Sequence, residues 1–232
     1  MQEYLLFIDT ETTDLPKKWH LSYDVPGNWP CAVQVSWRVY CRNGTKLKEQ
    51  NYFIKNYDGK ISATALGIHG ITHQFLTDHG TVRSEVLQAL SSDLQQFQPM
   101  IIGHFLELDY HILGAEYYRE GIHRHPMEGL PCFCIMTASR HLQQNPHCKY
   151  LKLGELYHLL FHQPLLQQHN ALADAAATAD CFFELVRKKE ITSFTQPPIV
   201  FAAKEKISNL AGWVIVALII IFTALLIACY YG

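Results

Sequence analysis

The sequence predicts an α/β domain with one mixed sheet flanked by helices, followed by a linker and an apolar C-terminal segment. Strand-like patterns fill the first 54 residues, whereas helical patterns alternate with short apolar runs from residue 81 onward. This order of elements is typical of a sheet with helices packed against it. The predicted parts are a folded domain over residues 1–190, a linker over 191–206 and a C-terminal segment over 207–232.

The first predicted element is a buried strand over the apolar run Tyr4–Ile8, which is followed by Asp9 and Glu11. Side chains alternate faces along a strand, so these two acids point to the same side, about 7 Å apart. Two carboxylates held that close repel each other unless a cation lies between them, as a hard metal such as magnesium would. The alternative is a strand that simply ends in a polar loop.

Two further strands are expected to complete an antiparallel meander. Residues 32–40 alternate between apolar and polar side chains, which predicts a half-buried strand with Gln34 and Ser36 on its polar face. Asn43-Gly44 predicts a hairpin turn, and residues 50–54 supply the returning strand. The preceding loop carries Trp19, Tyr23 and Trp29, which either stack on unpaired bases or, more commonly, pack beneath the loop.

Helical periodicity begins at Thr81 and returns after a short buried strand at Met100–Ile102. Helices are expected over residues 81–97, from Gly103 through Tyr117, and over 136–142, 151–161 and 171–186. In the second of these, Asp109 shares an inward face with Phe105, Leu106, Ile112 and Leu113. An ionised carboxylate on a buried face is costly unless it is paired or bound to a metal, so Asp109 is either a ligand or lies at the edge of the apolar stripe.

The last helix begins beside a histidine and an aspartate. Asn170 is a good N-cap, which places His169 just outside the helix and Asp174 near its first turn. Both side chains can then face one cleft, and the helix N-terminus favours an ionised Asp174. Taken alone, this pattern is more often a capped helix than a site.

The charge balance limits the kinds of nucleic-acid binding that the sequence allows, and the cysteine content indicates the redox state of the thiols. The 19 basic and 21 acidic residues give no global positive field, which argues against wrapping a long duplex but not against a small cleft for a strand end. The seven cysteines form no Cys-x-x-Cys pair and their number is odd, so reduced thiols are expected.

The C-terminal segment is predicted to span a membrane. Residues 207–232 carry no charged side chain, and residues 210–231 would form about 33 Å of helix, enough for a hydrocarbon core of about 30 Å. Trp213 and the pair Tyr230-Tyr231 fit interfacial anchors. Lys204 and Lys206 lie on the N-terminal side, so the positive-inside rule predicts a single-pass membrane anchor with the folded domain in the cytoplasm.

Together, the acidic stretches resemble the DEDDh branch of the DnaQ-like 3′–5′ exonuclease superfamily, particularly the bacterial DNA polymerase III epsilon-type proofreading enzymes. The resemblance rests on residues 7–13, on residues 169–174 and on Ile68–Thr72, which is similar to the family's His-Gly-Ile-Thr stretch. It spans about residues 4–187 and implies a ribonuclease-H-like fold with a mixed sheet of about five strands. The second motif departs from the usual Gly-His-Asn-x-x-Phe-Asp, because Phe105 and Leu108 replace the asparagine and the phenylalanine.

The resemblance also implies a site with two Mg²⁺ ions, for which Mn²⁺ could substitute. Asp9, Glu11 and Asp174 would hold one ion, while Asp9 would bridge to a second whose shell Asp109 completes. His169 would take the proton from the attacking water, since an unperturbed imidazole titrates near neutral pH.

Substrate contacts are likewise implied by the resemblance, at Thr10, Thr12, His69 and Phe105. The expected reaction is removal of nucleoside 5′-monophosphates from the 3′ end of nucleic acid, with single-stranded DNA favoured. One alternative is an exoribonuclease that trims RNA or short oligonucleotides. Another is an inactive, membrane-anchored binding module, although all four acids and the histidine are present. A polymerase partner is possible by analogy, without support from the sequence.

Overall fold

The computed structural model describes residues 3–55 and 59–194, and its helices and strands all belong to one compact unit. The predicted membrane segment and most of the predicted linker lie outside these ranges. In the part of the chain that the structure describes, no helix is both long and apolar enough to cross a bilayer.

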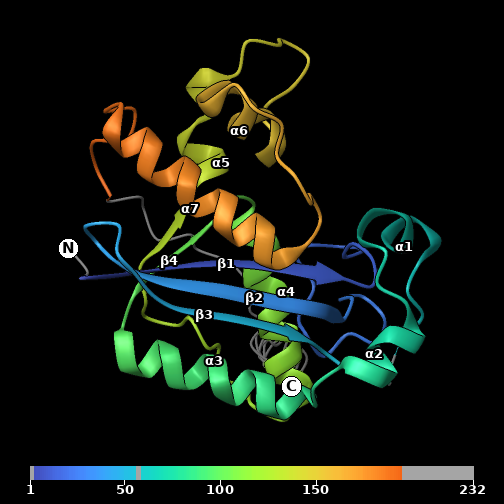
Figure 1. The fold of residues 1–232 in the computed structure, drawn as a ribbon. Coiled ribbons are helices and arrows are strands. Elements are labelled where there is room, and N and C mark those ends of the chain that lie inside the picture. The colour runs from blue at the N-terminus through green and yellow to red at the C-terminus, as the bar shows by residue number, and fades with distance from the viewer. Residues whose placement is uncertain (1–2, 56–58, 195–232) are drawn as a thin grey trace, which may run out of the picture. The chain divides into compact units, whose positions relative to one another are not determined.

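The core of the fold is a five-stranded mixed sheet in the order β3-β2-β1-β4-β5 (Figure 1). β1, β2 and β3 form the predicted antiparallel meander, while β4 and β5 run parallel to β1. The strands are β1 (Tyr4–Thr12), β2 (Ala32–Cys41), β3 (Lys46–Phe53), β4 (Met100–Gly103) and β5 (Cys132–Cys134). Since β1 pairs on both edges, it is the central strand.

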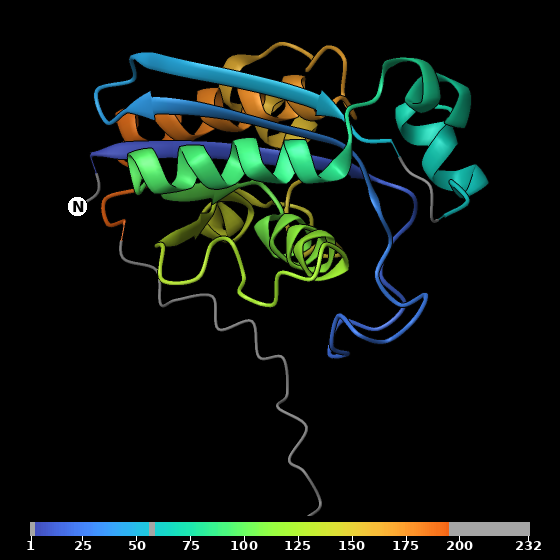
Figure 2. The same cartoon turned by 90° about the horizontal axis from the view of Figure 1, so that it is seen from below.

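Helices cover both faces of the sheet (Figures 1 and 2). One face packs on α3 and α4 through a cluster that includes Trp37, Leu90 and Ile112. The other packs on α6 and α7 through a cluster that includes Phe7 and Phe182. The helices are α1 (Ala63–His69), α2 (His73–His79), α3 (Arg83–Phe97), α4 (Leu106–Arg119), α5 (Ile135–Ala138), α6 (Leu153–Phe161) and α7 (Ala171–Arg187), with a 3₁₀ turn, η1, at Arg140–Leu142.

The structure corrects four details of the predicted elements. β3 begins at Lys46, four residues earlier than expected, and the predicted helix over 136–142 is divided into α5 and η1. The helices α1 and α2 were not predicted, because each has only seven residues and one buried side chain. Both are instead started by local caps, in which the hydroxyls of Ser62 and Thr72 accept hydrogen bonds from backbone N–H groups.

The fourth correction concerns β2, which was expected to be half-buried and is buried on both faces. Gln34 and Ser36, on its polar face, have no exposed surface because α7 packs over them. Their polar groups are satisfied internally: both donate to Asn51 Oδ1, at 2.8 and 2.7 Å, and Gln34 Oε1 accepts from the Ala171 backbone N–H at 3.1 Å. The polar face of β2 therefore fixes the first residue of α7.

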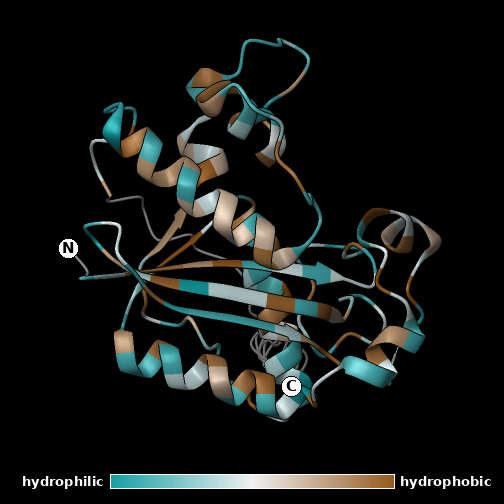
Figure 3. Ribbon diagram, in the orientation of Figure 1, coloured by the Kyte–Doolittle hydropathy of each residue, from teal (hydrophilic) through white to brown (hydrophobic). Residues whose placement is uncertain are grey.

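Hydropathy along the ribbon changes at the carboxyl end of the central strand. Figure 3 shows hydrophobic residues over β4 and the first half of β1, and hydrophilic residues where β1 ends. Leu6, Phe7 and Ile8 are fully buried, whereas Asp9 and Glu11 follow immediately. The core thus ends where the acidic residues begin.

Replacing Gln34 by leucine should lower the free energy of unfolding by about 1–3 kcal/mol, because the buried Ala171 N–H loses its acceptor and Asn51 Oδ1 loses one of its two donors. Urea denaturation monitored by circular dichroism measures this change. Gln74→Leu is the matched control, since Gln74 is exposed and bonds only to Asp78 on its own helix; its effect should stay within about 0.5 kcal/mol. Equal stability losses in both variants would contradict the supporting role of Gln34.

Candidate active site

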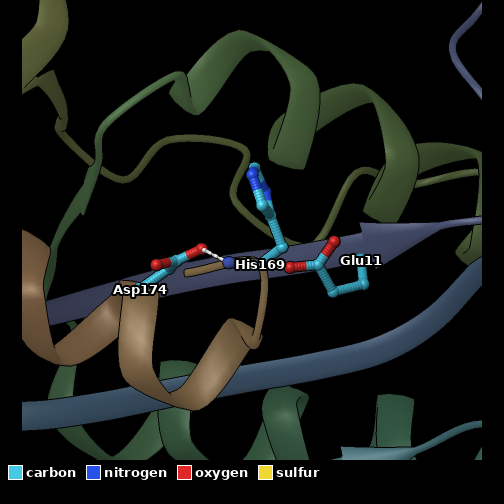
Figure 4. A group of neighbouring side chains, drawn as sticks. All are labelled: Glu11, His169 and Asp174. Atoms are coloured by element: carbon cyan, nitrogen blue, oxygen red, sulfur yellow. Dashed lines mark hydrogen bonds between the residues drawn. The ribbon is translucent and has the colours of Figure 1, made fainter. Parts of the chain in front are cut away.

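Four carboxylates and one imidazole converge beside the carboxyl end of β1. Asp9 and Glu11 come from the strand, Asp109 from α4, and Asp174 from α7, with His169 just before that helix. The ligand atoms of Glu11, His169 and Asp174 all lie within 4.8 Å of one another (Figure 4). The structure therefore brings together the residues that the sequence scatters over 166 positions, from 9 to 174.

The order of strands explains how Asp109 reaches the cluster. β4 runs parallel to β1, so α4, which follows it, starts near the carboxyl end of β1. Asp109 lies in the first turn of α4, is only 4% exposed, and accepts a 2.8 Å hydrogen bond from the Thr10 hydroxyl. The predicted inward orientation of Asp109 is confirmed. Phe105, expected on the same face, instead precedes the helix and is 36% exposed.

The beginning of α7 holds His169 and Asp174 in a fixed relation. The Asn170 side chain accepts hydrogen bonds from the N–H groups of Leu172 and Ala173, and so caps the helix as predicted. Asp174 Oδ2 accepts from the His169 backbone N–H at 2.9 Å (Figure 4). His169 itself has a left-handed backbone with φ of 63°, which turns the chain so that its imidazole lies outside the helix and beside Glu11.

Burial and mutual repulsion disfavour the ionised form of these acids. Burial, together with the charge of Asp174, raises the pKa of Glu11 to about 8. Burial raises the pKa of Asp109 to about 7, although the hydrogen bond from Thr10 opposes the change. The pKa of Asp9 is well above its usual range because of burial and of its three acidic neighbours. The pKa of Asp174 is also raised, mainly by burial.

This donor set suits a hard divalent cation. Oxygen ligands from several carboxylates are what Mg²⁺ and Mn²⁺ prefer, and a cation among them would remove the repulsion. Asp174 Oδ1 is buried and has no hydrogen-bond partner among the described residues, so it is available as a ligand. The residues present therefore fit a metal ion.

The cluster opens into a cavity of about 470 Å³. All four residues predicted to contact substrate line it: Thr10, Thr12, His69 and Phe105. The side chains of the first three are already engaged within the protein. Thr12 donates to the Asp14 carbonyl, and His69 bonds to the Thr12 carbonyl and to the Ile71 N–H. Phe105 is the most exposed of the four, since Thr10 and Thr12 are buried and His69 is half-buried.

Sequence reasoning missed several residues of this cavity. Leu15, His104, Tyr150 and Lys152 also line it, together with Ile68 of the Ile68–Thr72 stretch that the resemblance had marked. The segment with Tyr150 and Lys152 is held in place by Leu151, whose carbonyl bonds to His104 Nε2 at 3.0 Å. The signal for His104 lay in its position beside Gly103 in the second motif, whereas nothing local marks residues 150–152 as part of the site.

Comparisons with known proteins agree with this arrangement. The profile of the Exonuclease family, RNase_T, matches residues 6–182. No curated protein sequence matches the chain.

Solved structures of exonucleases share the fold. E. coli exonuclease I in complex with a dT13 oligonucleotide superposes with a TM-score of 0.66 at 17% identity, covering 82% of this chain and 42% of that one. Exonuclease I from Methylocaldum szegediense superposes with a TM-score of 0.63 at 21% identity, covering 82% of this chain and 42% of that one. A 3′-exonuclease that recognises the histone mRNA stem-loop superposes with a TM-score of 0.60 at 11% identity, covering 81% of this chain and 83% of that one.

The match is therefore to one part of the exonuclease I chains and to most of the 3′-exonuclease chain. At these identities the structural likeness establishes the ribonuclease-H-like fold, and the family profile covers well over half of the sequence. The chain belongs to the Exonuclease family of the DnaQ-like superfamily.

Proposed function

We propose that this protein is a metal-dependent 3′–5′ exonuclease of the DEDDh branch, which releases nucleoside 5′-monophosphates from strand ends. The observation that carries the proposal is the convergence of four acids and one histidine. Asp9, Glu11, Asp174 and His169 line one cavity, and the buried Asp109 lies close enough to Asp9 to raise its pKa. Membership of the Exonuclease family supports a nuclease reaction, and the structural neighbours include enzymes named for attack on 3′ ends.

In this proposal Asp9, Glu11 and Asp174 would hold Mg²⁺ or Mn²⁺, and Asp109 would contribute to binding a second ion. Bound divalent ions would activate water and stabilise the leaving 3′ oxygen. His169 accepts the proton of the attacking water, because its imidazole lies beside the acids yet outside α7 and exposed. The Thr10 hydroxyl keeps Asp109 oriented through its 2.8 Å hydrogen bond, so its side chain positions a proposed ligand, while Thr10 also lines the cavity that would receive substrate.

DNA is the favoured substrate of the proposal, and RNA is the second candidate. Exonuclease I was solved with oligodeoxynucleotides, whereas the 3′-exonuclease recognises an mRNA stem-loop and is matched over 83% of its length. An inactive binding module is disfavoured because all four acids and the histidine occupy the site.

The purified protein should shorten 5′-labelled DNA or RNA oligonucleotides stepwise from the 3′ end when Mg²⁺ or Mn²⁺ is present, and chelation should stop the reaction. Asp9→Asn should abolish cleavage because a metal ligand is lost. Glu107→Gln, which removes an exposed carboxylate near the second motif, is the control and should retain activity. A cleaving Asp9→Asn enzyme would contradict the metal assignment, and a wild-type protein inert on both sugars would favour the binding module.

The role of His169 is tested in the same assay with asparagine. Asparagine tolerates the left-handed backbone at this position better than alanine does, so the loss of the imidazole is separated from backbone strain. His169→Asn should lower kcat by roughly 10²–10⁴-fold, the usual contribution of a general base. Unchanged turnover would remove His169 from the reaction.

The raised pKa values of Glu11 and Asp109 predict how pH affects the metal-free protein. For a carboxyl whose folded pKa exceeds its unfolded value, the stabilising contribution is complete below the unfolded pKa near 4 and is lost as pH rises through the folded value of about 7 to 8. In EDTA, the Tm should therefore be lower at about pH 8.5 than at about pH 6, and Mg²⁺ should reduce or reverse this difference. In Glu11→Gln the side chain at position 11 cannot titrate, so the Tm of this variant in EDTA should depend less on pH. A wild-type Tm that rises with pH in EDTA, with no response to Mg²⁺, would be inconsistent with this site.

We further propose that residues 207–232 tether the domain to a membrane. The support is the uncharged apolar sequence described above. The full chain should float with phosphatidylcholine vesicles on a density gradient, whereas a chain ending at residue 206 should remain at the bottom. Flotation of both, or of neither, would overturn the anchor.

A further inference from the structure

Phe105 presents a large aromatic side chain inside the candidate active-site cavity. It follows the buried His104 and precedes α4, with a non-helical backbone at φ −119° and ψ 57°. The side chain is 36% exposed although phenylalanine is normally buried, and it lines the same cavity as the acids. An exposed aromatic ring at this place requires an explanation other than core packing.

The ring of Phe105 is backed by a rigid aromatic cluster. Its centroid lies 5.7 Å from that of Trp19, which meets Trp29 edge-on at 6.1 Å and 87°. Trp29 in turn stacks on His111 at 4.8 Å and 22°, and His111 Nδ1 is hydrogen-bonded to the Tyr23 hydroxyl at 2.9 Å. The loop aromatics thus pack against α4 and against each other. Of the aromatic side chains in this cluster, Phe105 is the one that lines the cavity.

The ring also lies close to the proposed chemistry along the chain. Phe105 precedes Asp109 by four residues, about one turn of helix. In the motif that this stretch resembles, asparagine usually stands at position 105 and phenylalanine at 108. Here the phenylalanine stands at position 105, three residues earlier than in the usual motif. Phe105 and Leu108 both line the cavity.

We propose that Phe105, supported by Trp19, is the platform on which an unpaired base of the substrate strand stacks. The inference rests on the nuclease function proposed above and specifies how its substrate is held. A base in the middle of a strand has both faces covered by its neighbours, whereas an unpaired base at the end can offer one face to a ring. Aromatic stacking favours single strands and is tolerant of sequence, because every base has a π-face. Since Trp19 holds the ring in place, little side-chain freedom is lost on binding.

Steady-state kinetics with modified oligonucleotides test the platform. Phe105→Leu keeps an apolar side chain but removes the ring, and it should raise KM for unpaired DNA by roughly 5- to 100-fold with little change in kcat, the range for one lost base stack. Phe105→Trp should restore KM. When the base that stacks is replaced by an abasic residue, at the last or the next-to-last position, the wild type and Phe105→Leu should have equal KM values. Ile122→Ala, an exposed apolar side chain outside this cavity, is the control and should leave KM unchanged.

An equal KM penalty on intact and abasic strands would show that Phe105 only supports the fold, and no penalty at all would exclude the contact. A binding experiment separates this inference from the nuclease proposal. Binding of the Asp9→Asn protein should quench the fluorescence of a 2-aminopurine placed at the 3′-terminal or penultimate position of the oligonucleotide. The double variant Asp9→Asn/Phe105→Leu should bind without this quenching. Quenching without any cleavage by the wild type would refute the nuclease and keep the platform. Cleavage without quenching, and without a KM effect, would refute the platform alone.

Discussion

The repulsion among four clustered carboxylates, three of them buried, is the constraint on which the site depends. Asp9 and Glu11 cannot separate, because they lie two residues apart on β1 and both positions are paired with β2. Asp109 and Asp174 are brought against them by helices on opposite faces. Hydrogen bonds from Thr10 and from the His169 backbone relieve only part of the repulsion, since the pKa of both helical acids stays raised. A bound cation would offset this repulsion, so the proposed metal would also stabilise the fold.

The precision of the cluster comes from polar groups inside the fold. Gln34 on β2 binds the first N–H of α7, Asn170 caps the next two, and Asp174 returns a bond to the His169 backbone. The bonds to Ala171, Leu172 and Ala173 satisfy donors that a helix N-terminus would otherwise leave free, and the bond from His169 fixes the residue before the cap. The histidine is thereby held beside the acids by backbone geometry, which leaves its imidazole available for a proton.

The sequence was sufficient for those features that are encoded locally. A buried run ending in Asp9 and Glu11, the period of α4 that turns Asp109 inward, and the Asn170 cap were all readable from neighbouring residues, and the structure confirms their geometry. Gln34 was not readable in this way, because the helix that covers it begins 137 residues later and alternation alone suggests a solvent-facing side chain. The short helices α1 and α2 were missed because seven residues with one buried side chain give no period.

The cavity itself suggests how a protein with a slightly negative net charge could hold nucleic acid. The net charge of the protein is −2, so little affinity for nucleic acid can come from overall electrostatic attraction to the phosphate backbone. On the proposed function, the acids bind the scissile phosphate through metal, and Phe105 with the apolar residues Leu15 and Ile68 meets the face of a base. Phosphate and base face are common to every nucleotide, whereas a free end is not. Such a site discriminates by the end of the strand and is indifferent to its sequence, which is the selectivity that stepwise removal of nucleotides requires.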